Sequence, residues 1–236
     1  MKSNNDLAEI GALLGDLARA AILEALIDGR ALTAKELAFR ARVSPQTASL
    51  HLRKLLEGNL LTVLQQGRHR YFRLSSPLVG QMLEAIGSVA AVHAPPRHRV
   101  RGPKDAALCE ARMCYDHLAG RIAVGIADAL VGRELLALQA DGGEVTPAGL
   151  RFFGELGIDL DQGRSRRRAF CRPCLDWTER RFHIGGSVGA ALAAYCFDRR
   201  WMERLRDSRA VMLTEAGRAG LRASFGIVTE PQAQAA

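Results

Sequence analysis

The chain has no apolar run long enough to span a bilayer, and its N-terminus lacks the basic-then-apolar layout of a signal peptide. From these absences we expect a cytoplasmic protein without a membrane partner. The cytoplasm is reducing, so stable disulfides are not expected there. The five cysteines are therefore candidates for metal or redox chemistry rather than for structural disulfide bonds.

Enzyme signatures are also missing. The chain has neither a nucleotide-binding glycine loop nor a convincing catalytic triad, so we expect a protein that is not an enzyme. Its formal net charge is +8 and its pI is near 9.8. Such a charge favours a polyanionic partner such as DNA, although charge alone would also fit RNA or a membrane surface. At 236 residues and 48% apolar, the chain is long enough for two domains.

The stretch that begins at Thr33 has the pattern of two helices joined by a tight turn. Thr33 and Glu36 form a capping-box pattern, which predicts a first helix that ends near residue 41. After the turn, Ser44 and Pro45 are typical of the N-cap and first position of a second helix. That helix is expected over 45–57, because a glycine and an asparagine follow it.

A β-hairpin is expected next, with strands at 60–64 and 71–74 and a turn at Gly67. The second helix exposes short polar side chains and then cations, which suit the base edges and phosphates of a major groove. The cationic hairpin tip lies where a wing would contact DNA. The residues expected to bind DNA are Gln46, Thr47, Ser49, His51, Arg53 and Lys54 on the helix, and Arg68, His69 and Arg70 on the hairpin. The alternative is a structural helical hairpin with solvated charges.

Residues 10–74 resemble the ArsR-type (ArsR/SmtB) winged helix-turn-helix regulators, most specifically in VSPQTASLHL at 43–52 and GRHRY at 67–71. The resemblance implies a homodimeric repressor that leaves its double-stranded DNA operator when a metal ion or a thiol-reactive signal arrives. It also implies that flanking helices, at 6–29 and 77–92, build the dimer. Many metal-responsive members carry a cysteine pair in the first helix of the motif, and that pair is missing here. No cysteine precedes Cys109, so a thiol sensor must lie beyond the DNA-binding domain.

We expect a winged-helix DNA-binding and dimerisation domain at 1–93, a basic proline-rich linker at 94–104 and a C-terminal sensor domain at 105–231. The linker either contacts DNA phosphates through its basic side chains or is a solvated connection between the domains. The sensor domain contains an internal repeat, in which His117 matches His183 and Gly120 matches Gly186. The fold expected is therefore mostly α, with a C-terminal helical domain built from two repeats, about 105–160 and 168–228.

Cysteines and histidines occur near the start of each copy of the repeat, with the spacings C-x4-C-x2-H and C-x2-C-x8-H. The candidate metal or redox residues are Cys109, Cys114, His117, Cys171, Cys174 and His183. Thiolate and imidazole together suit a soft or borderline divalent ion such as zinc, cadmium or lead. On one helix, Cys114 and His117 would share a face while Cys109 would turn away. A site that draws on both copies is therefore more natural, and its combination of ligands stays open.

A redox alternative rests on Cys171 and Cys174, because arginines at 164, 166, 167, 168 and 172 surround them and Pro173 could begin a helix. Both features favour a reactive thiolate. A purely structural role, with small thiols and hydrogen-bonded histidines in a core, is the third interpretation.

The function expected is a DNA-binding repressor that is released when a thiophilic metal ion binds the C-terminal domain. The first alternative is a repressor that responds to thiol oxidation at Cys171 and Cys174. Less favoured are an effector-free DNA-binding protein and a dithiol enzyme that the DNA-binding module merely locates.

Overall fold

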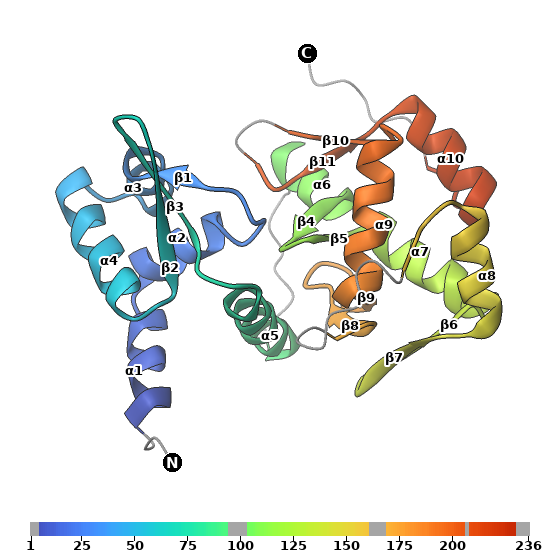
Figure 1. The fold of residues 1–236 in the computed structure, drawn as a ribbon, viewed down its shortest axis with the longest axis horizontal. Coiled ribbons are helices and arrows are strands. Elements are labelled where there is room, and N and C mark those ends of the chain that lie inside the picture. The colour runs from blue at the N-terminus through green and yellow to red at the C-terminus, as the bar shows by residue number, and fades with distance from the viewer. Residues whose placement is uncertain (1–4, 94–102, 161–168, 206–207, 230–236) are drawn as a thin grey trace. The chain divides into compact units, whose positions relative to one another are not determined.

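The computed structural model describes residues 5–93, 103–160, 169–205 and 208–229 (Figure 1). The chain divides into two compact units, Met1–Ile86 and Gly87–Ala236, here called the N-terminal and C-terminal units. Most of the predicted linker, the arginines at 164–168 and the tail from 232 lie outside the described residues. Among the described helices, none is both long and apolar enough to cross a membrane.

The N-terminal unit combines a small helical bundle with a three-stranded sheet. Helices α2, α3 and α4 contact one another, and α4 contacts β2. The antiparallel sheet has the order β1-β3-β2. Its elements are α1 (Asn5–Leu14), α2 (Leu17–Ala25), β1 (Leu32–Thr33), α3 (Ala34–Ala41), α4 (Pro45–Glu57), β2 (Leu61–Gln66) and β3 (His69–Leu74), followed by α5 (Pro77–His93), which crosses the boundary between the units. This is the winged helix-turn-helix arrangement expected from the sequence.

Helices α3 and α4 begin at the caps that the sequence predicts. The backbone N–H of Thr33 donates to Oε2 of Glu36 at 2.7 Å, and the Thr33 hydroxyl accepts from the backbone N–H of Glu36 at 3.4 Å. Ser44 accepts from the backbone N–H of Thr47 at 3.1 Å. Each cap satisfies backbone donors that the helix itself leaves open, so each fixes the start of its helix.

The C-terminal unit has the expected helices but more strands than we expected. Its described residues form four two-stranded antiparallel hairpins as well as helices. Its first half runs α6 (Pro103–Glu110), β4 (Arg112–Cys114), β5 (His117–Ala119), α7 (Arg121–Gly132), β6 (Leu136–Gln139), β7 (Gly142–Val145) and α8 (Pro147–Glu155). Its second half runs β8 (Arg172–Leu175), β9 (Phe182–Gly185), α9 (Gly186–Asp198), β10 (Met202–Arg204), β11 (Val211–Leu213) and α10 (Glu215–Phe225). Each of these strands has three or four residues, which is too few for the alternation of apolar and polar residues to identify it.

In both halves the order from β4 and from β8 is hairpin, helix, hairpin, helix (Figure 1). Local details recur as well. The hydroxyls of Thr146 and Thr214 each accept from a backbone N–H three residues on, both at 3.0 Å. Helix α9 contacts β5 and helix α7 contacts β9, so each helix packs on the first hairpin of the other half. The two halves therefore share one core, which includes Leu130, Phe153, Val188 and Leu221.

Candidate functional site

Helix α4 separates buried apolar side chains from exposed polar ones. Ala48, Leu52 and Leu55 are buried, because positions three and four apart fall on one face of a helix. Gln46, Ser49, Arg53 and Lys54 are exposed, and Thr47 is half-buried. The Ser49 hydroxyl donates to the backbone oxygen of Pro45 at 2.8 Å, and the hydroxyls of Ser44 and Thr47 lie 2.9 Å apart. Helix α4 thus presents an amide and two cations on one exposed side.

His51 is placed differently from the other residues predicted on this helix. Its Nδ1 lies 3.7 Å from a carboxylate oxygen of Asp16, and only 16% of its side chain is exposed. Asp16 is the N-cap of α2, so His51 faces the joint between α1 and α2. The reason is periodicity, because residue 51 lies three positions after the buried Ala48. The structure therefore turns His51 toward the protein core and not toward the exposed face.

The hairpin of β2 and β3 is longer than predicted and its turn is shorter. The ladder continues to the pair Gln66 and His69, which leaves only Gly67 and Arg68 in the turn. Gly67 has a φ of +59°, a conformation that glycine adopts without steric cost. Arg68, His69 and Arg70 are all exposed, so the hairpin tip carries a concentrated positive charge.

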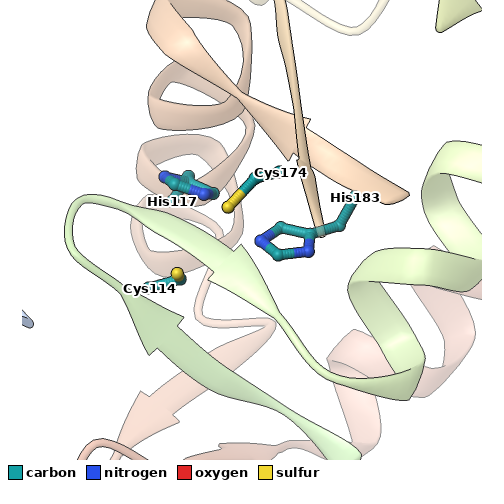
Figure 2. Close-up of side chains that lie close together, drawn as sticks. All are labelled: Cys114, His117, Cys174 and His183. Carbon is teal, nitrogen blue, oxygen red and sulfur yellow. The ribbon is translucent and has the colours of Figure 1, made fainter. Parts of the chain in front are cut away.

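A second constellation lies in the C-terminal unit, where Cys114, His117, Cys174 and His183 converge (Figure 2). Each offers one potential ligand atom, and these atoms all lie within 4.8 Å of one another. Cys114 is half-buried and the other three are buried. We call these four residues the Cys/His cluster.

The hairpins explain why these four side chains meet. Cys114 pairs directly with His117 across β4 and β5, and Cys174 pairs with His183 across β8 and β9. Directly opposed residues of an antiparallel pair project from the same face, so each hairpin presents one thiol and one imidazole together. Strands β5 and β9 contact each other and bring the two pairs into one cluster. The expectation that Cys114 and His117 share a helix face is thus corrected.

Two predicted members do not join the cluster. Cys109 lies in α6 and Cys171 precedes β8, and both are buried apart from the four converging side chains. Pro173 lies within β8 and does not begin a helix. Burial raises the pKa of the Cys171 thiol to about 11, which opposes the reactive thiolate that the redox interpretation requires. All five cysteines are in the described part of the chain, and none is disulfide-bonded.

Burial and mutual contacts favour the uncharged forms of the cluster side chains. A hydrogen bond with Cys174, together with burial, raises the pKa of Cys114 well above its usual range. Burial, and then the neighbouring His117, lower the pKa of His183 well below its usual range. Both ring nitrogens of His183 are buried without a hydrogen-bond partner among the described residues. Two sulfur and two imidazole donors that converge in a mostly buried cluster fit a tetrahedral ion such as zinc.

Sequence reasoning missed a buried ion pair beside the cluster. Arg112 donates to Oδ2 of Asp176 at 2.8 Å, and both side chains are almost fully buried. The one signal in the sequence was the pattern Cys-x-Asp, which occurs at 114–116 and again at 174–176. Nothing in that pattern shows that Asp176 contacts a residue from the other half of the unit.

Comparisons with known proteins agree with the fold of the N-terminal unit. A family model described as a helix-turn-helix domain matches residues 14–63. An uncharacterised HTH-type transcriptional regulator of Bacillus subtilis, YdfF, is 42% identical over 219 residues, which are 91% of this chain and 95% of that protein. The chain therefore belongs to the HTH-type transcriptional regulators.

Two similar solved structures each cover less than half of this chain. One is the homodimeric winged helix-turn-helix domain of a possible ArsR-family regulator from Mycobacterium bovis, at 22% identity and a TM-score of 0.37, covering 43% of this chain and 98% of that one. Another is the cadmium metal-sensor CMTR from Mycobacterium tuberculosis, at 25% identity and a TM-score of 0.32, covering 41% and 98%.

Proposed function

We propose that this regulator is a homodimeric repressor whose operator binding is controlled by a thiophilic metal ion in the C-terminal unit. The observation that carries the proposal is the coexistence of two sites in one chain. One is an exposed polar and cationic face on α4 with a cationic hairpin tip, and the other is the buried Cys/His cluster.

For DNA binding, α4 would enter the major groove, with Gln46, Thr47 and Ser49 near base edges and Arg53 and Lys54 near phosphates. Arg68, His69 and Arg70 would hold the hairpin against the backbone or minor groove. His51 would act differently, by fixing α4 against Asp16. Its contribution would be to orient the helix.

The homodimer is supported by large apolar side chains that stand exposed on the flanking helices. Leu7 in α1 and Leu17 in α2 are 81% and 91% exposed, and Leu78 in α5 is 72% exposed. Exposed apolar side chains of this size favour a protein interface. In the ArsR-type regulators that residues 10–74 resemble, the corresponding helices build the dimer.

For sensing, Cys114, His117, Cys174 and His183 would hold one ion of the zinc, cadmium or lead class. We infer that the C-terminal unit consists of two copies related by a pseudo-twofold axis, each supplying one cysteine and one histidine. A bound ion would tie the two first hairpins together and favour one arrangement of the unit. Repression would be relieved if that arrangement has a lower affinity for the operator.

The test starts from DNA selected out of a random pool by the purified full chain. We expect zinc, cadmium or lead to release this DNA and a chelator to restore its binding. Cys174→Ser should bind the DNA but lose the response to metals. Cys109→Ser, which changes a buried cysteine outside the cluster, should respond as the unsubstituted chain does. Unchanged binding with all three metals, and also after mild oxidation, would identify an effector-free DNA-binding protein.

A second candidate is redox control through Cys114 and Cys174, since both thiols belong to the group whose donor atoms lie within 4.8 Å. Two thiols and one molecule of hydrogen peroxide would give one disulfide bond and two molecules of water. This pair takes the place of Cys171 and Cys174, because Cys171 lies outside the four converging side chains. Mass spectrometry of the metal-free chain after peroxide treatment would detect the cross-link, and loss of DNA binding with it would favour this candidate.

A further inference from the structure

Asp176 is a fully buried carboxylate that follows directly after β8. Its Oδ1 accepts from the backbone N–H groups of Thr178 and Glu179 at 2.8 and 3.0 Å, and from the Thr178 hydroxyl at 2.6 Å. These bonds lie within one turn of chain between β8 and β9. They fix the orientation of the carboxylate without any help from a ligand.

The other oxygen of Asp176 reaches across to the first half of the C-terminal unit. Oδ2 accepts from Arg112 at 2.8 Å and from the backbone N–H of Gly120 at 2.6 Å. Arg112 begins β4, and Gly120 is the N-cap residue of α7. The carboxylate therefore joins the hairpin that carries Cys174 and His183 to the segment that carries Cys114 and His117.

The same oxygen also lies beside a member of the Cys/His cluster. The distance from Oδ2 of Asp176 to Nδ1 of His183 is 3.8 Å. Carboxylates next to the non-ligating nitrogen of a metal-bound histidine hold the ring in one tautomer and one orientation. We propose that Asp176 is a positioning residue for the metal site: with an ion bound, its Oδ2 accepts from Nδ1–H of His183, a contact that at 3.8 Å is here longer than a hydrogen bond, and so directs Nε2 toward the ion. This inference rests on the proposed metal site.

The surroundings of Asp176 allow it to remain charged in this role. The Arg112 guanidinium lies 2.8 Å from one oxygen of Asp176, and the hydrogen bonds from Thr178, Glu179 and Gly120 supply further donors to the carboxylate. A charged carboxylate is the stronger acceptor for an imidazole N–H. Because the same group links the two halves, ligand orientation and docking of the halves depend on one side chain.

The hairpin of β4 and β5 also places a carboxylate beside its histidine, which allows a comparison with Asp176. Oδ1 of Asp116 lies 3.4 Å from Nδ1 of the neighbouring His117, but 31% of the Asp116 side chain is exposed. Water competes more effectively for an exposed carboxylate than for a buried one. Asp116→Asn is therefore a control that removes an equivalent acid from the other histidine, with a smaller expected effect.

The experiment is a cobalt(II) titration of the full chain, followed by thiolate-to-metal and ligand-field absorption, with zinc competition to obtain relative affinities. We expect Asp176→Asn to weaken affinity by about 10- to 100-fold, and Asp116→Asn to weaken it less. Equal affinities of Asp176→Asn and the unsubstituted chain would overturn the inference while leaving the metal site intact. Failure of the unsubstituted chain to bind cobalt would overturn both proposals.

A measurement without substitution guards against a variant that does not fold, because Asp176→Asn also leaves Arg112 without its carboxylate. In the zinc-loaded chain, long-range proton–nitrogen correlation spectra distinguish the protonated and metal-bound nitrogens of each histidine ring. We expect His183 to bind through Nε2 and to carry its proton on Nδ1. Binding through Nδ1 would overturn the inference, since that nitrogen could not then donate to Asp176.

Discussion

In the N-terminal unit the side chains proposed to bind DNA come from one continuous stretch, 46–70, and most of them are exposed. In the C-terminal unit the Cys/His cluster combines two hairpins distant in the chain, and three of its four members are buried. The DNA-binding side chains lie on the surface of the N-terminal unit, outside its core, whereas the Cys/His cluster is part of the buried interior of the C-terminal unit. Substitutions should therefore separate function from stability in the first site and couple them in the second.

The largest effect is expected for Arg112→Met, which leaves Asp176 buried without its cation. Removing one partner of a buried ion pair costs about 3 to 5 kcal/mol in the free energy of unfolding. The chain contains two tryptophans, Trp177 and Trp201, and both lie in the C-terminal unit. Urea unfolding followed by tryptophan fluorescence therefore reports this unit, and its midpoint should fall sharply.

The control for that prediction is Arg181→Met. Arg181 pairs with Asp128 at 2.5 Å, but their side chains are 61% and 43% exposed. An exposed pair contributes at most about 1 kcal/mol. Equal losses for Arg112→Met and Arg181→Met would contradict the view that burial makes the first pair critical.

The second prediction tests whether the two units are independent. Leu52 is 2% exposed in the helical core under α4, and Leu52→Ala should cost about 2 to 5 kcal/mol, because it removes buried apolar packing and leaves a cavity. DNA binding should be lost with the support of α4. Cobalt affinity at the Cys/His cluster should remain unchanged, and a weakened cobalt site would show that the comparison between the units is too simple.

The third prediction concerns the exposed face of α4 and involves no loss of stability. Arg53→Ala should weaken binding to every DNA sequence, and the slope of log affinity against log salt should fall by about one, because one fewer phosphate is neutralised. Lys35→Ala removes an exposed cation of α3 outside the proposed face and should change the slope less. An effect of Arg53→Ala at one base position alone would rule out the phosphate role.

The two units also differ in how far their sequences predict them. The bounds of α3 and α4 follow from local signals at Thr33, Ser44 and Gly58, each of which acts within four residues. The link between Asp176 and Gly120 spans 56 residues, so it depends on how two hairpins dock. The spacing of cysteines in the sequence grouped Cys109 and Cys171 with the four residues of the Cys/His cluster. Only the tertiary packing shows that these two cysteines lie apart from the cluster.

The smallest effect is expected at the cap of α3. Thr33→Ala removes a side-chain cap and should cost about 1 kcal/mol, without altering the exposed face of α4.

Hydrogen bonds from the side chain and backbone of Thr33 lower the pKa of Glu36. A carboxyl whose pKa is lowered on folding contributes stability above its unfolded pKa and loses that contribution as the pH falls through the folded value. Unfolding of the N-terminal unit, followed by helical circular dichroism from pH 7 to pH 3, should therefore show a smaller loss in Thr33→Ala than in the unsubstituted chain. An identical pH dependence would mean that the Thr33 side chain contributes nothing through the charge of Glu36.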